Sequence, residues 1–224
     1  MKARLPLYAA ALLLISLLLG SCSIKQLAVD TVIDALSEGG STTFTGDNDP
    51  ELVGDALPFA LKLYETLLAQ SPDNRGLLRT TGSGFIMYSN VYVQMPADML
   101  PSSRHEERSE MRQRAKKLYI RGRDYVIDAL DVGYPGFSDA LENDDYQEYL
   151  GKMTEEDVPD LYWAGSGWLG AIAINAFDVK LGITREKAIA LIQRALEIDE
   201  SYGNGAIHEL LISYYGSLPA MLGG

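Results

Sequence analysis

Cys22 is the residue whose type and position point most directly to a chemical reaction, the acylation of its thiol. It is the only cysteine among 224 residues, and the small residues Gly20 and Ser21 come directly before it. Residues 1–21 begin with basic side chains and continue into an apolar run, as secretory signals do. We therefore predict a lipoprotein signal peptide over residues 1–21 and a lipid anchor on Cys22. The alternative is a signal anchor with an incidental cysteine.

The residue after the cysteine bears on where the anchored chain would lie. Ser23 stands where an aspartate would favour retention at the inner membrane. We therefore predict sorting to the outer membrane of a bacterium with two membranes, with the protein facing the periplasm. Acylation of the thiol also excludes disulfides and thiol catalysis.

The two histidines, His105 and His208, are the next candidates for metal or acid–base chemistry. They are far apart, and neither belongs to a motif with ligand spacing, such as two histidines four residues apart. The sequence also contains no GxSxG and no P-loop. We therefore predict no metal, no cofactor and no nucleophilic catalysis.

Acidic pairs could supply the two carboxyl groups that a glycosidase needs. Glu142 with Asp145, and Glu155 with Asp157, have suitable types and short spacings. In a chain with 31 acidic residues, however, such pairs are expected by chance. The prediction is that the protein is not an enzyme.

Net charge limits the partners. Without residues 1–21 the chain keeps 17 basic and 31 acidic residues, a formal charge of −14. Polyanions such as nucleic acids, and anionic lipid surfaces, bind basic proteins. We therefore predict no nucleic-acid partner and attribute membrane attachment to the lipid alone.

The helix expected over LYWAGSGWLGAIAINAF (161–177) holds both tryptophans and three glycines. A glycine inside a helix costs about 1 kcal/mol relative to alanine. A helix keeps three of them where another backbone, or a ligand, must come close. The stretch is therefore either the central packing helix or one wall of an apolar cavity.

A second aromatic segment follows GSGF in the helix before Pro96. Its tyrosines lie four residues apart, and the amides Asn90 and Gln94 form the adjacent face. Together with the glycine-rich helix, this segment supplies the candidate ligand contacts. They are Tyr88, Tyr92, Trp163, Trp168 and Asn175.

The elements that must position these side chains are helices, because strand signals are sparse. Residues 56–85 read as two helices across a turn at Ser71–Asn74. Their small, aromatic and proline positions follow the order of a tetratricopeptide repeat. The matching residues are Ala60, Tyr64, Leu67, Pro72, Leu78, Gly82 and Phe85.

Weaker matches recur later in the chain, around Ala115, Ala164, Ala188 and Ile207, although without a clean period. The predicted fold is all-α, with helical hairpins stacked as degenerate tetratricopeptide-like repeats in a solenoid or bundle. The alternative is an irregular helical bundle with chance matches. We expect a signal peptide over 1–21, an N-terminal helix and tether over 22–48, and a helical domain over 49–224.

Three segments carry a resemblance to a known family: YSNVYVQMPADML, LYWAGSGWLGAIAIN and HELLISYYGSLPAMLGG. They are similar to segments of the TatT family, periplasmic lipoproteins associated with TRAP (tripartite ATP-independent periplasmic) transporters. The resemblance covers most of 49–224. It implies a helical fold with cryptic tetratricopeptide repeats and no known catalytic role. It also implies a homotrimer that docks a periplasmic solute-binding protein, with a pore or cleft for a hydrophobic ligand.

Members of that family usually continue past the Leu-Gly-Gly that ends this sequence, so we expect the last helix or helices of the domain to be missing. Two other functions remain open. One is a general envelope-assembly scaffold that binds peptides or proteins on a concave face. The other is a protein that binds or hydrolyses cell-wall glycan through Tyr88, Tyr92, Trp163 and Trp168.

Overall fold

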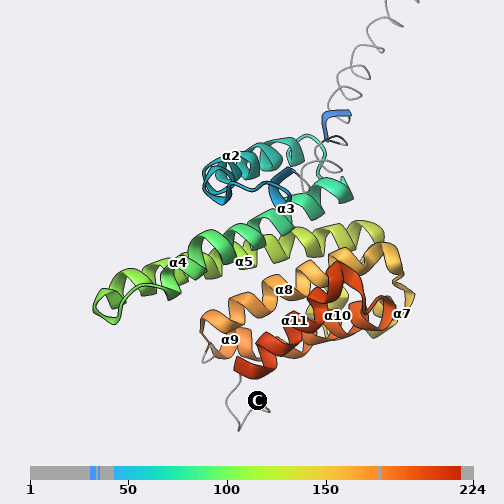
Figure 1. Cartoon of the computed structure of the whole chain (residues 1–224). Coiled ribbons are helices and arrows are strands. Elements are labelled where there is room, and N and C mark those ends of the chain that lie inside the picture. The colour runs from blue at the N-terminus through green and yellow to red at the C-terminus, as the bar shows by residue number, and fades with distance from the viewer. Residues whose placement is uncertain (1–30, 34, 36–42, 176–177, 218–224) are drawn as a thin grey trace, which may run out of the picture.

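The computed structural model describes residues 31–33, 35, 43–175 and 178–217, and every regular element among them is a helix (Figure 1). The predicted all-α class is confirmed. Whether the hairpins form tetratricopeptide-like repeats stays a prediction. The signal peptide, Cys22 and residues 218–224 lie outside the described residues. Among the described helices, none combines the length and the apolar character needed to cross a bilayer.

The first two helices form the hairpin that the sequence predicts. Helix α2 (Pro50–Leu68) begins after Asp49, whose carboxylate accepts a hydrogen bond from the Leu52 N–H at 3.0 Å. Helix α3 (Arg75–Tyr88) begins after Asn74, whose side chain accepts a bond from an N–H of the first turn at 2.8 Å. Both caps satisfy N–H groups that have no partner inside their helix, which fixes where each helix starts.

Beyond α3 the chain continues in almost the same direction and then turns back. It passes through a π-helix, η1 (Ser89–Gln94), and the short α4 (Met95–Asp98). The sequence predicts that Pro96 ends or kinks the helix, and the helix does end soon after it. A 3₁₀ turn, η2 (Ser102–Arg104), then leads into α5 (His105–Gly133), a single helix of 29 residues.

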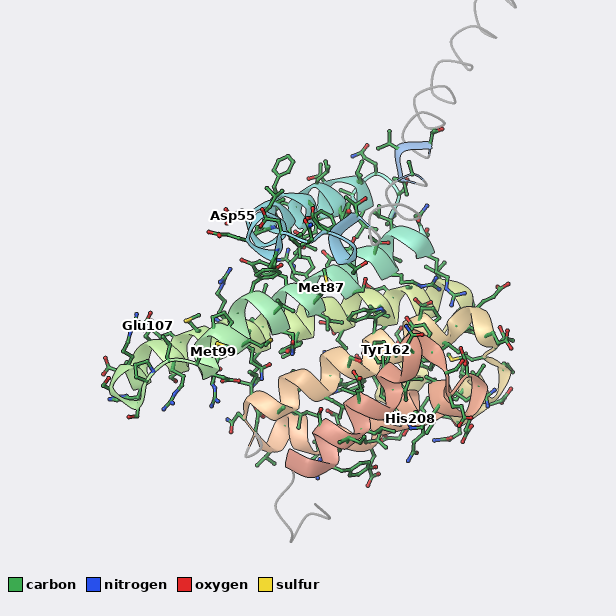
Figure 2. All side chains as sticks on the ribbon, in the orientation of Figure 1. Asp55, Met87, Met99, Glu107, Tyr162 and His208 are labelled. Atoms are coloured by element: carbon green, nitrogen blue, oxygen red, sulfur yellow. The ribbon has the colours of Figure 1, made fainter. Side chains whose placement is uncertain are left out.

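We call residues 89–114 the arm, because they extend beyond the other helices (Figure 1). Figure 2 shows Met99 and Glu107 on it.

Residues 104–123 carry eight Lys or Arg against three Glu. The segment after α5 has the opposite sign, with nine acidic residues and one lysine over 137–160.

The glycine, proline and acidic residues over 131–159 predict an irregular insertion with short helices, and the structure has one. It contains α6 (Phe137–Glu142), α7 (Gln147–Lys152) and the 3₁₀ turn η3 (Glu155–Asp157). Phe137 is fully buried and fixes the insertion against the core.

Helix α8 (Val158–Ile174) lies at the centre of the C-terminal part, between α5 and α10 (Arg185–Ile198). Short α9 (Val179–Gly182) precedes α10, and α11 (Tyr202–Ser217) follows it. The backbone of α11 turns through left-handed conformations at 203–205, where the sequence predicts a turn.

Side chains of the neighbouring helices pack against the glycines of α8. A Cβ on Gly165 would lie 2.5 Å from Ile192 of α10, and one on Gly167 would lie 2.8 Å from Ile86 of α3. One on Gly170 would lie 2.7 Å from the Tyr119 ring of α5. All three glycines therefore lie where neighbouring helices pack closely, as the packing interpretation of this helix predicts.

A buried ionic cluster ties α3 to the start of α8. The Asp160 carboxylate is fully buried and pairs with Arg75 and Arg79. Arg75 also pairs with Asp157, which accepts a hydrogen bond from the Tyr134 hydroxyl at 2.6 Å. The cluster joins residues that are about eighty positions apart in sequence.

Candidate functional site

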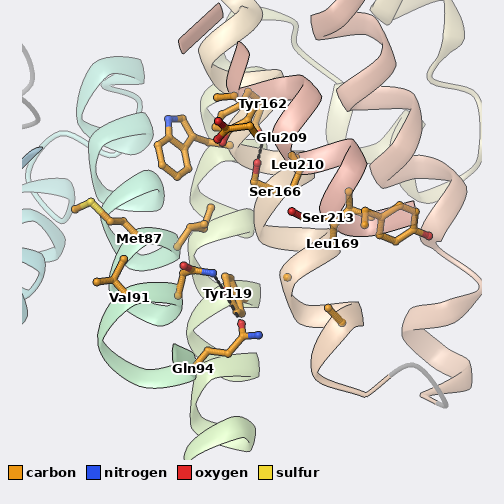
Figure 3. Close-up of a pocket in the computed structure, with 17 residues that line it drawn as sticks. Met87, Val91, Gln94, Tyr119, Tyr162, Ser166, Leu169, Glu209, Leu210 and Ser213 are labelled. Carbon is orange, nitrogen blue, oxygen red and sulfur yellow. Dashed lines mark hydrogen bonds between the residues drawn. The ribbon is translucent and has the colours of Figure 1, made fainter. Parts of the chain in front are cut away.

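A cavity of about 540 Å³ lies between α3, η1, α5, α8 and α11 (Figure 3). A cavity of this size falls in the range that holds small-molecule ligands. Its walls are largely apolar. The apolar lining residues are Ile86, Met87, Val91, Trp163, Leu169, Gly170, Ala173, Ala206 and Leu210.

One end of the cavity carries a chain of hydrogen bonds centred on the Tyr119 hydroxyl. This hydroxyl accepts a bond from the Asn90 amide at 2.9 Å and donates to the Gln94 amide oxygen at 2.7 Å. Burial raises the pKa of Tyr119 to about 12, so the hydroxyl keeps its proton at neutral pH. The π-helix η1 supplies both amides, and π-helical turns are frequent at functional sites.

The other end is formed by Tyr162, Ser166 and Glu209 (Figure 3). The Ser166 hydroxyl donates to the Tyr162 carbonyl at 2.6 Å, so the backbone of α8 already engages it. Glu209 is exposed and is the one charged side chain among the residues that line the cavity. No Lys or Arg lines it.

Trp163 stands at this second end, with its ring edge-on to Tyr162 at a centroid distance of 5.3 Å. It also lines a smaller hollow of about 80 Å³ between α2 and α3. Met87 lines both hollows as well. Phe44 and Thr45, which precede α2, close the smaller hollow from outside. Trp163 and Met87 therefore form the partition between the two spaces.

Of the five predicted ligand contacts, the structure places Trp163 alone in the cavity wall. Tyr88 and Tyr92 stack on each other at 5.6 Å on the side facing α2. The Tyr92 hydroxyl donates to the Pro50 carbonyl at 2.8 Å, and the Tyr88 hydroxyl accepts a bond from Arg114 at 3.4 Å. Tyr92 therefore connects α2 to η1, and Tyr88 connects α5 to the end of α3.

Trp168 and Asn175 also lie outside the cavity. Trp168 is buried, donates from Nε1 to the Thr184 hydroxyl at 2.8 Å and lies under the Arg123 guanidinium. Asn175 is exposed at the end of α8, beside a separate hollow near His105. The predicted set is therefore dispersed over the surface and core of the domain.

The polar residues at the Tyr119 end of the cavity are not among the predicted ligand contacts. The sequence does show Asn90 and Gln94 four residues apart on a helix, which is the one signal that could have found it. Tyr119 gave no such signal, since it fits the apolar stripe of α5. Within the described residues, no group of three or more His, Cys, Asp or Glu could hold a metal ion.

Comparison with known proteins identifies the family of the chain. The family model described as TRAP transporter T-component matches residues 46–224. The chain is also similar to an uncharacterised protein of Treponema pallidum (strain Nichols), at 37% identity over 93% of this chain and 69% of the relative. The protein therefore belongs to the TRAP transporter T-component family, a family of transporter components rather than enzymes, and is an accessory protein of a TRAP system in the cell envelope.

Proposed function

We propose that this T-component is a lipid-anchored, periplasm-facing scaffold that docks a solute-binding protein and accepts an apolar ligand in the cavity. Cys22 is the anchor, and residues 22–48 are the tether to the outer membrane. The helices act as degenerate tetratricopeptide-like hairpins, and the assembly is a homotrimer, as the family resemblance implies. Light scattering on the purified mature chain tests the trimer, and mass analysis of its N-terminus tests the lipid.

The cavity is the observation that carries the ligand part of this proposal. It has about 540 Å³ of space, an apolar wall and one polar end, which is the arrangement of a small-molecule site. Its walls come from four helices and η1, so the packing of the whole domain sets its shape. Extraction and mass spectrometry of small molecules that copurify with the chain would test it, and a chain that carries none and binds no apolar probe contradicts it.

The arm supplies the surface proposed for docking. Val91, Met95 and Met99 are exposed and spaced four residues apart, so they share one side of the arm. Val91 also lines the cavity, so a partner seated on this side would lie next to the cavity mouth. Exposed apolar patches mark interaction sites, and methionine side chains adapt to varied surfaces.

Capture of the solute-binding protein encoded with the same TRAP system tests docking. Met99→Glu should abolish capture, because a carboxylate would be buried against an apolar partner surface. Val179→Glu is the matched control, since Val179 is 76% exposed on α9 and Met99 is 77% exposed on the arm. Equal capture by both variants would place docking elsewhere, and capture of many unrelated envelope proteins would favour the general assembly scaffold.

A further inference from the structure

The two ends of the cavity differ in a way that specifies its ligand. We infer that the cavity binds a long-chain amphiphile whose uncharged, hydrogen-bonding head lies at Asn90, Gln94 and Tyr119 and whose tail passes Trp163 into the smaller hollow under α2. This inference rests on the proposed ligand-accepting function and names its ligand class.

The polar end suits a head group that both donates and accepts. A side-chain amide has two N–H donors and an acceptor oxygen. The bonds to the Tyr119 hydroxyl use one donor of Asn90 and one acceptor site of Gln94. The remaining capacity of this pair matches a hydroxyl or amide, which offers one or more N–H or O–H groups and a lone pair.

The charges around the cavity exclude an anionic head. No Lys or Arg lines it, and its one charged lining residue, Glu209, is itself an anion. Moving a carboxylate from water to such a site without a cationic partner is costly. Glu209 is exposed at the end opposite to Gln94 (Figure 3), so it gives a cationic head no partner at the polar end. The Asp98 carboxylate, which accepts a hydrogen bond from the Gln94 amide at 3.4 Å, is already paired with Arg112 at 2.6 Å.

The path of the tail follows from α8. Trp163 and Gly170 are seven residues apart on this helix, which corresponds to roughly 10 Å along its axis. Gly170 is in contact with the Tyr119 ring at the polar end, and Trp163 forms the partition to the smaller hollow. A tail that starts at the amides and runs along α8 therefore meets the indole before it reaches the space closed by Phe44.

Trp163 fluorescence can report this binding directly in the full mature chain. Trp168→Phe removes the other tryptophan, which lies outside the cavity. In that background, alkyl chains of equal length with a glycerol, carboxylate or trimethylammonium head are titrated at neutral pH. The glycerol head should bind at least tenfold more tightly than either charged head. Asn90→Leu should reduce that preference severalfold.

Tail position is tested with glycerol-headed chains that carry bromine either beside the head or near the middle. Bromine near the middle should quench Trp163 more strongly. Lengthening the chain should tighten Kd by about fourfold per methylene while burial continues. Ser83→Phe, which fills the smaller hollow from α3, should remove this gain for long chains and leave short chains unchanged.

The outcomes separate the inference from the function beneath it. Equal affinity for all three heads, or tighter binding of a charged one, overturns the head assignment while a ligand function stands. Stronger quenching of Trp163 by bromine beside the head overturns the proposed tail path. This test does not depend on whether the Ser83→Phe variant folds. No binding of any amphiphile overturns the proposed ligand function itself.

Discussion

Gly82 of α3 and Gly122 of α5 meet backbone to backbone. A Cβ on Gly82 would lie 2.6 Å from the Gly122 carbonyl oxygen, and a Cβ on Gly122 would lie 2.6 Å from the Gly82 carbonyl oxygen. Neither oxygen can retreat without moving its helix. This reciprocal contact sets the distance between α5, which holds Tyr119, and α3, which continues into η1 with Asn90. It therefore sets the geometry of the polar end of the cavity.

Alanine at either glycine should therefore force the helices apart. We expect Gly82→Ala and Gly122→Ala each to lower the free energy of unfolding by about 1–3 kcal/mol or more, measured by urea denaturation. Gly151→Ala is the control, because nothing lies within 4 Å of a Cβ at that helical position. It should stabilise the protein by about 0.4–1 kcal/mol. Neutral effects at Gly82 and Gly122 would contradict the close approach.

The buried carboxylate of Asp160 should be more important for stability than surface ion pairs. Its side chain has no exposure, and Arg75 contacts it at 2.7 Å. Asp160→Ala leaves the partly buried Arg79 guanidinium without a carboxylate partner and leaves Arg75 with Asp157 alone, so we expect a loss of about 3 kcal/mol in chemical denaturation. Glu148→Ala, which removes an exposed pair with Lys152, should leave the midpoint unchanged. Similar denaturation midpoints for the two variants would contradict the stabilising role of the Asp160 carboxylate.

Asp157 should make stability depend on pH in the acidic range. Burial alone would raise the pKa of this carboxyl, but hydrogen bonds from Tyr134, the Thr154 backbone and Arg75 outweigh burial and hold its pKa below the ordinary value. The unfolded state then takes up a proton at a higher pH than the folded state does. The free energy of unfolding should therefore fall as pH drops below about 4 and through the lower folded pKa.

Asp157→Asn tests that assignment. The variant should be less stable at neutral pH, and its urea midpoint should change less than that of the parent chain between about pH 5 and about pH 3. A parent and a variant with parallel pH profiles would show that other carboxyl groups dominate acid unfolding.

Substitution of Trp163 should mainly weaken ligand binding, whereas substitution of Trp168 should mainly lower stability. Trp163 is half-buried in the cavity wall, so Trp163→Ala should weaken binding of an alkyl probe by about tenfold with a smaller loss of stability. Trp168 is buried and bonded to Thr184, so Trp168→Ala should cost about 3–5 kcal/mol and leave the probe affinity of the folded protein unchanged. Thermal melts and titration calorimetry of both variants would show the reversed pattern if the cavity is assigned wrongly.

Local signals in the sequence were sufficient for much of the helical layout. The regular apolar periodicity of 185–198, with Thr184 as a cap before it and a turn after it, predicts a helix with these bounds, and α10 spans Arg185–Ile198. Asp49 and Asn74 cap their helices because short polar side chains can reach the first N–H groups. Thr184 occupies the predicted cap position of α10, but its hydroxyl instead donates to the Leu181 carbonyl and accepts from Trp168.

The site was less predictable, because its walls come from segments far apart in sequence. The spacing of Tyr88 and Tyr92 shows that they share a face, but it does not show that α2 covers that face. Tyr119 reads as an ordinary core residue until Asn90 and Gln94 are placed beside it. The π-helix that presents those amides has no recognisable sequence signature, so the polar end could be found only from the packed helices.

The opposite charges at the two ends of α5 give the molecule a permanent dipole moment. The basic residues of 104–123 lie along the first two thirds of α5, a helix roughly 43 Å long, and the acidic residues of 137–160 follow its other end. At low salt the electric field of this dipole orients an approaching charged partner before contact. Encounters in the binding orientation are then more frequent than they would be for randomly oriented molecules. The association rate constant, more than the lifetime of the complex, should therefore decline as ionic strength rises.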